Sequence, residues 1–141
     1  MAKYVIDANV VFTCLISGKE EYLALFDKHQ IFLPDFAMSE IQKYQLVILQ
    51  KTKMGFLDFQ DYTLRLFDRI AVIPNLIVST TSYLEAFRWC HDVDEDDMAY
   101  AALAIEVGVP LVTKDDELVT GLRRKGFQPI ISFKEFIEKG T

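Results

Sequence analysis

The chain has 141 residues, of which 51% are hydrophobic and 26% are charged, a composition typical of one globular domain with a substantial core. Its net charge of −6 argues against a surface adapted as a whole to nucleic acid, because such surfaces are usually basic. No run approaches the roughly 20 apolar residues that cross a bilayer, and "MAKYVID" at the start lacks a leader pattern. We therefore expect a single domain over residues 1–141, cytoplasmic and without membrane contact.

Short apolar strands alternate with helical patterns along the chain. The predicted strands are residues 3–7, 30–34, 70–74, 109–113 and 128–132. The predicted helices cover residues 9–17 (closed by Gly18), 20–29, 36–50, 56–69, 83–90, 99–108, 117–125 and a short stretch after Ser132. Helices between consecutive strands imply right-handed crossovers and parallel pairing. The fold class expected is α/β, with a mainly parallel central sheet in a three-layer α/β/α arrangement.

Two helix starts and one helix face can be predicted in more detail. Ser82 with Glu85, and Ser132 with Glu135, have the spacing of a capping box, in which a hydroxyl and a carboxylate each bind a backbone N–H at the start of a helix. The apolar face of helix 56–69 is predicted to consist of Phe56, Phe59, Leu64, Leu66 and Phe67.

Acidic residues that are far apart in the sequence are predicted to meet at one edge of the sheet. Asp7 ends the first strand, Asp115 follows the strand that ends at Thr113, and Glu40 lies early in the helix after "FLP". A further acidic run, 94–97, precedes the helix "AYAALAIEVG". Parallel strands all end at the same edge, crossover helices start there, and α/β domains place their ligand sites there.

A carboxylate cluster at this edge would suit Mg²⁺ or Mn²⁺ and the hydrolysis of a phosphodiester. The sequence offers no Gly-rich phosphate loop, no Ser-His-Asp arrangement and no His or Cys pair at zinc spacing. The alternative is that these acids form only solvated loops and helix caps. Asp94, Asp96 and Asp97 could cap the helix that follows them, and Asp116 is the expected cap of helix 117–125.

Four segments of the chain together resemble the PIN domain, the nuclease fold shared by VapC-type toxins and many RNA-processing factors. They are "YVIDANVVF", "LPDFAMSEIQKY", "VDEDDMAYAALAIEVGVPLVTKDDEL" and "FQPIISFKEFI". The resemblance implies an endoribonuclease that cleaves single-stranded RNA with Mg²⁺ or Mn²⁺. It implies as catalytic and metal-binding acids Asp7, Glu40, Asp97 and Asp115, with Asp94 as an additional candidate ligand and with Asn9 and Thr113 in supporting positions.

The resemblance leaves several biological roles open. The chain could be a toxin paired with an antitoxin, an RNA-processing nuclease, or a catalytically weak PIN-fold interaction module. A receiver domain would need an acidic pair after the first strand, and a HAD-like phosphatase would need an Asp at the position of Asn9. The aromatic-rich helices of 40–69 offer either a homodimer or partner surface, or a face that packs on the domain. The candidate phosphate contacts are Lys43, 51–53, Arg65, Lys114 and 123–125.

Overall fold

In the computed structural model, which describes residues 2–94 and 97–140, the chain folds around a five-stranded sheet with the order β3-β2-β1-β4-β5. All the strand pairs are parallel, which confirms the predicted fold class. The strands are β1 Lys3–Ile6, β2 Gln30–Pro34, β3 Ile70–Ile73, β4 Leu111–Thr113 and β5 Ile130–Ser132. Each lies within a predicted strand, so the periodicity located them correctly.

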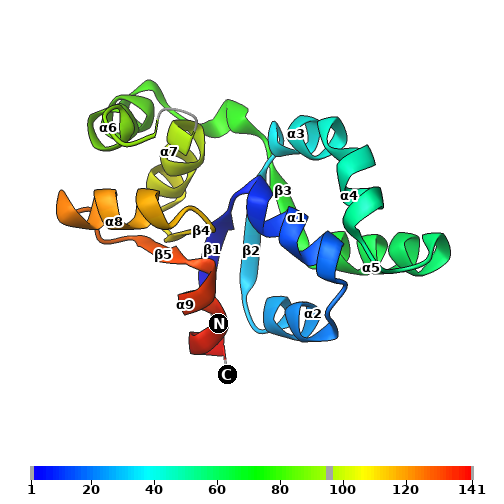
Figure 1. Cartoon of the computed structure of the whole chain (residues 1–141). Coiled ribbons are helices and arrows are strands. Elements are labelled where there is room, and N and C mark those ends of the chain that lie inside the picture. Colours follow the sequence, from blue (N-terminus) through cyan, green and yellow to red (C-terminus); the bar gives the residue numbers. More distant parts are fainter. Residues whose placement is uncertain (1, 95–96, 141) are drawn as a thin grey trace.

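Helices lie on both sides of the strands (Figure 1), with α1 to α5 on one side of the view and α6 to α8 on the other. They are α1 Ala8–Ser17, α2 Glu20–Asp27, α3 Ala37–Lys43, α4 Gln45–Lys51, α5 Phe56–Asp68, α6 Thr80–Cys90, α7 Met98–Val107, α8 Asp116–Arg124 and α9 Phe133–Gly140, with a 3-10 turn η1 at Asn75–Ile77. Among the described residues, no helix is long and apolar enough to cross a membrane.

The long helix predicted over 36–50 is divided in the structure into α3 and α4. The break falls at Tyr44, whose backbone has φ −100° and ψ 14°. No Gly or Pro marks this position, and apolar residues continue at helical spacing across it, so the sequence pattern did not indicate a break. By contrast, α1 ends as predicted at Gly18, which adopts the left-handed conformation with φ 63°.

The predicted apolar face of α5 is partly wrong. Leu66 is fully buried, but Phe56 and Leu64 are each 68% exposed. The side chain that joins Leu66 in the core is Tyr62, whose hydroxyl donates a hydrogen bond to the Lys19 carbonyl at 2.8 Å. Since Tyr62 and Leu66 are four residues apart on the buried face, Leu64 between them points away from the core.

One predicted capping box is confirmed and the other is wrong. The Ser132 N–H donates to Glu135 at 3.1 Å and the Glu135 N–H donates to the Ser132 hydroxyl at 3.1 Å, as predicted for α9. Helix α6, however, begins three residues earlier than the box at Ser82 implied. Its cap is Ser79, which accepts a hydrogen bond from the Ser82 N–H at 3.2 Å. Ser82 itself lies inside the helix.

The Ser79→Ala variant should lower the free energy of unfolding by about 1 kcal/mol, because the first turn of α6 loses its side-chain cap. Glu85→Ala should change it by less than about 0.5 kcal/mol, since an exposed helical residue outside a capping box contributes little. Urea unfolding of both variants measures the difference. A larger loss in Glu85→Ala than in Ser79→Ala would contradict this assignment of the cap.

Candidate metal centre

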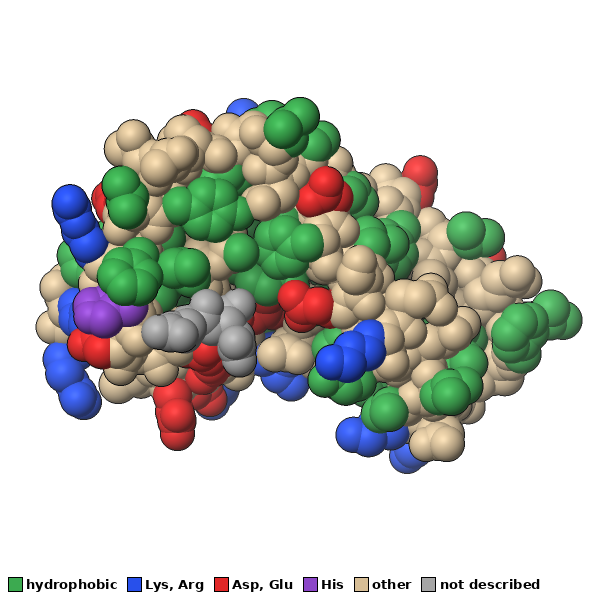
Figure 2. All heavy atoms as spheres, turned by 90° about the horizontal axis from the view of Figure 1, so that it is seen from above, with side chains coloured by type: hydrophobic (Ala, Val, Ile, Leu, Met, Phe, Trp, Pro, Cys, Tyr) green, Lys and Arg blue, Asp and Glu red, His purple; other side chains and the backbone are tan. Residues whose placement is uncertain are grey.

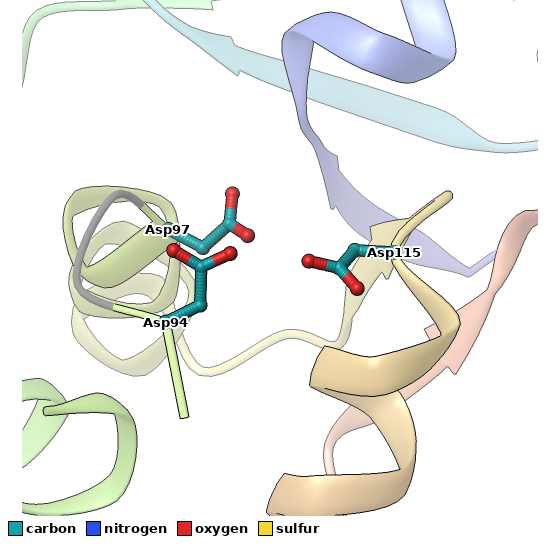
Figure 3. Close-up of side chains that lie close together, drawn as sticks. All are labelled: Asp94, Asp97 and Asp115. Atoms are coloured by element: carbon teal, nitrogen blue, oxygen red, sulfur yellow. The ribbon is translucent and has the colours of Figure 1, made fainter. Parts of the chain in front are cut away.

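Three carboxylates from two parts of the chain form a cluster at the carboxyl edge of the sheet. Asp115 lies in the turn between β4 and α8, Asp97 directly precedes α7, and Asp94 lies in the segment between α6 and α7. One oxygen of each lies within 4.8 Å of one oxygen of each of the others. Figure 3 shows Asp94 and Asp97 facing Asp115 across the space between α7 and α8. Three of the sequence-predicted acids are thus brought together.

Asp7 lies at the end of β1 and is almost completely buried, with 2% of its surface exposed. One of its oxygens accepts a hydrogen bond from the Val10 N–H at 3.0 Å and so caps α1. The other accepts a hydrogen bond from the Thr113 hydroxyl at 2.6 Å. That hydroxyl in turn accepts a hydrogen bond from the Asp115 N–H at 3.0 Å. Thr113 therefore links Asp7 to the backbone of Asp115 and holds the ends of β1 and β4 together.

Burial and repulsion between neighbouring carboxylates raise the pKa values of Asp7 and Asp97. Burial raises the pKa of Asp7 to about 6, although hydrogen bonds from Thr113 and Val10 oppose the rise. Burial also raises the pKa of Asp97 to about 8, with further increases from the charges of Asp7 and Asp94 and from a hydrogen bond shared with Asp94. A bound cation would remove much of this cost, so both raised pKa values mark the cluster as a place for positive charge.

Glu40 reaches the same region from α3. Its Oε1 accepts a hydrogen bond at 3.1 Å from the hydroxyl of Tyr100 on α7. Asn9, in the first turn of α1, is exposed and lines the same cleft as Glu40. Tyr100 was not among the predicted site residues. It lies three residues after Asp97, a spacing that places the two on one side of a helix and could have indicated its role.

The cluster opens into a cleft of about 830 Å³. The residues that line it, apart from the acids, are Asn9, Phe12, Thr13, Ile16, Lys43, Tyr44, Val47, Ile48, Lys51, Tyr100 and Lys114. Figure 2 looks down on this edge of the sheet and shows acidic side chains near the centre of the face, in a hollow with basic side chains close by. Acidic and basic groups therefore share one cleft.

Six of the basic residues predicted as phosphate contacts fall into two groups, and Lys53 and Arg124 belong to neither. Lys43, Lys51 and Lys114 line the cleft, and within the described ranges none of them forms an ion pair with a carboxylate. The other group is neutralised within the protein: Arg65 pairs with Glu20 and Asp61 at 2.9 Å each, Arg123 pairs with Glu135 at 3.0 Å, and Lys125 pairs with Asp92. Only the first group is placed to meet a substrate in the cleft.

The helix-cap alternative is corrected for two of the acids. Asp115, and not Asp116, caps α8, because its Oδ1 accepts a hydrogen bond from the Leu118 N–H at 3.1 Å. Asp97 precedes α7 but its side chain makes no capping hydrogen bond. Asp96 lies outside the described residues. Within the cluster, Asp115 therefore also caps a helix, whereas helix capping does not account for the position of the Asp97 side chain.

The donor set fits a hard divalent cation. Asp94, Asp97 and Asp115 offer only carboxylate oxygens, which suit Mg²⁺ and Mn²⁺ better than Zn²⁺. Both cysteines, Cys14 and Cys90, are buried as free thiols, so neither offers a sulfur ligand to the cleft. Asp94, Asp97 and Asp115 lie close enough together to share one ion, and Asp7 and Glu40 are near enough for their charges to act on this cluster or on each other.

Fold and cleft define a class: a parallel α/β/α domain with acids gathered at the carboxyl edge of its sheet. The sequence matches a family model described as "PIN domain" over residues 5–131. The chain therefore belongs to the PIN domain family, as its motifs predicted. Proteins of this family are generally nucleases that use divalent metal ions.

Two solved structures share the fold. The crystal structure of PAE2754 from Pyrobaculum aerophilum is 15% identical, with a TM-score of 0.64 over 99% of this chain and 96% of that chain. The structure of VapBC2 from Rickettsia felis bound to a DNA fragment from their promoter is 17% identical, with a TM-score of 0.64 over 92% of this chain and 98% of that chain. No curated protein matches the sequence.

Proposed function

We propose that this chain is a metal-dependent endoribonuclease that hydrolyses phosphodiester bonds of single-stranded RNA. The observation that carries the proposal is the meeting of Asp94, Asp97 and Asp115 within 4.8 Å of one another, in a cleft that lysines also line. Family membership supports the nuclease class. The charge of −6 is compatible with an RNA substrate, because a bound cation would offset part of the acidic charge in the cleft.

In this proposal Asp7, Glu40, Asp97 and Asp115 are the catalytic and metal-binding acids, with Asp94 as a further ligand. Bound Mg²⁺ or Mn²⁺ would supply a water of lowered pKa and would neutralise charge on the leaving oxygen. Thr113 would fix Asp115 through its backbone N–H, Tyr100 would orient Glu40, and Asn9 would contribute a polar group to the cleft wall. Lys43, Lys51 and Lys114 would hold the phosphates of the strand.

We further propose that the nuclease is the toxin of a cytoplasmic toxin–antitoxin pair and forms a homodimer. Exposed apolar side chains on α4 and α5 support a protein partner: Leu46, Phe56, Leu57 and Leu64 are all more than two-thirds exposed. The same observation favours the alternative, a PIN-fold interaction module without strong catalysis. A small DNA-binding protein encoded immediately upstream, if it co-purifies with this chain, would favour the toxin over the module.

The purified protein should cleave single-stranded RNA in Mg²⁺ or Mn²⁺, poorly in Ca²⁺, and not in EDTA, because in the proposed mechanism the ion supplies the water of lowered pKa and neutralises charge on the leaving oxygen. Electrophoresis of an end-labelled RNA after incubation in each condition measures the outcome. Equal cleavage in EDTA by a contaminant-free preparation would disprove metal dependence. Inactivity on varied RNAs in both Mg²⁺ and Mn²⁺ would leave the interaction module as the better account.

A further inference from the structure

One wall of the cleft carries a continuous stripe of side chains across the junction of α3 and α4. The cleft-lining residues of this wall are Glu40, Lys43, Tyr44, Val47 and Lys51. The helix breaks at Tyr44, so no single helical face carries them; what the five side chains share is the cleft that they all line. The stripe runs from a carboxylate of the proposed centre, through an aromatic ring flanked by a lysine, to a second lysine. A carboxylate (Glu40), an aromatic ring (Tyr44) and a lysine (Lys51) thus line the same wall of the cleft.

Tyr44 presents its ring from the break between the two helices. It is 44% exposed, although it lines the cleft and packs against a neighbouring ring. The ring of Phe12 on α1 contacts it at a centroid distance of 5.5 Å and an interplanar angle of 70°. The Lys43 ammonium lies 5.7 Å from its centroid. Edge-to-face support from Phe12 fixes the orientation of the ring and leaves part of its surface open to the cleft.

Proteins that bind single-stranded nucleic acid combine a partly exposed aromatic ring with lysines, and the lysines here form no ion pair with any carboxylate in the described part of the chain. Bases stack on such rings without regard to sequence, and cationic groups beside them track the phosphates. Lys43 lies beside the ring, and Lys51 lines the cleft about two turns further along α4. Lys114 comes from the turn after β4, next to Asp115 in sequence. A phosphate held by these lysines and a base stacked on Tyr44 would place the strand between the cations and the acids.

We propose that Tyr44 is a base-stacking residue that holds one nucleotide of single-stranded RNA beside the carboxylate cluster. The inference rests on the proposed nuclease function and adds a positioning residue to it. It also gives a physical reason for a preference for single strands, because a base inside a duplex is already stacked on its neighbours and cannot reach the ring. Little sequence preference is expected from this contact, since every base offers a flat face.

Binding can be measured without cleavage by using Ca²⁺ and a short oligouridine that contains one 2-aminopurine, whose fluorescence falls when the base stacks. The parent should quench this fluorescence on binding. Tyr44→Leu, which keeps apolar packing on Phe12 but has no ring face, should raise the Kd about tenfold and abolish the quenching. Tyr44→Phe should keep both the Kd and the quenching. In Mn²⁺, the loss of cleavage in Tyr44→Leu should be mainly in KM, with kcat changed less.

Tyr22 provides a control, because the Lys19 ammonium lies 5.6 Å from its ring centroid but the ring lines a neighbouring pocket, which meets the cleft at Thr13 and Lys114 and does not include Tyr44. Tyr22→Leu should leave Kd and quenching unchanged. Equal losses in the two leucine variants, unchanged quenching in Tyr44→Leu, or no binding of the RNA by the parent would each overturn the inference. Quenching that depends on Tyr44 without any cleavage in Mn²⁺ would instead support the stacking role and refute the nuclease. Cleavage in Mn²⁺ that does not depend on Tyr44 would support the nuclease and refute the stacking role.

Discussion

Asp115→Asn is expected to lower the rate of RNA cleavage by at least about a hundredfold, a loss of roughly 2.7 kcal/mol of transition-state stabilisation. The amide keeps the shape of the side chain, and its oxygen can still accept the hydrogen bond from the Leu118 N–H that caps α8. The change therefore removes the negative charge from the cluster and leaves the helix start intact. Initial cleavage rates of a labelled RNA in Mn²⁺ measure the effect, and circular dichroism confirms the fold.

The adjacent residue supplies the control for this experiment. Asp116 is exposed, lies in the first turn of α8, and is not part of the carboxylate cluster. Asp116→Asn makes the same change in charge one residue away and should leave the rate within about threefold, a difference under 1 kcal/mol. An Asp115→Asn protein that is folded and cleaves at the parental rate would remove Asp115 from the catalytic residues. Similar losses in both variants would point to a general effect of charge.

The architecture of the sheet followed from the sequence because strand and helix periods differ clearly. Buried parallel strands such as "QIFLP" read as short apolar runs, and the helices between them left little choice of topology. The predictions that were wrong concern the residue at which α6 begins and the side chains that α5 buries. A serine three residues before a glutamate occurs by chance at Ser82. Only the hydrogen bond from the Ser82 N–H to the Ser79 hydroxyl shows that Ser79 caps α6.

The candidate cluster was predictable for a related reason. Strand ends are easy to recognise, so an acid directly after a strand, such as Asp115, can be assigned to the carboxyl edge without knowing any side-chain position. Contacts between elements could not be predicted in this way. Nothing in the sequence shows that Thr113 binds Asp7, or that the Tyr100 hydroxyl reaches Glu40 on α3. Such contacts depend on how far each helix is rotated and shifted on the sheet.

The state of Asp7 illustrates the same limit. Its place at the end of β1 suggested a direct metal ligand, yet both of its oxygens already accept hydrogen bonds from Val10 and Thr113. A carboxylate oxygen has more than one acceptor site, so these bonds are compatible with binding an ion. They also give Asp7 a structural role, because its side chain connects the start of α1 to the end of β4. Sequence position alone could not separate the two tasks.

Asp97→Asn is expected to stabilise the metal-free protein by about 1 kcal/mol at pH 8, because it removes one charge from a partly buried cluster of like charges. The pKa of Asp97 is raised from 3.8 to about 8, so its folded state favours the protonated form. An acid with a raised folded-state pKa costs stability as the pH rises from about 4 through about 8, where the unfolded chain is ionised and the folded chain resists ionisation. The advantage of the asparagine should therefore shrink towards pH 4 and grow towards pH 8.

Addition of Mn²⁺ should reverse the order of the two proteins. An ion that binds only the folded state stabilises it by RT ln(1 + [L]/Kd), so the parent should gain about 2.7 kcal/mol when Mn²⁺ reaches a hundred times its Kd. Asp97→Asn should gain much less, because the site loses a ligand and a charge, whereas Asp116→Asn should follow the parent. Thermal melts of the three proteins across a Mn²⁺ titration at pH 8 measure these gains without any RNA. If Asp97 served only the start of α7, parent and Asp97→Asn would rise in parallel, and parallel curves would remove Asp97 from the metal centre.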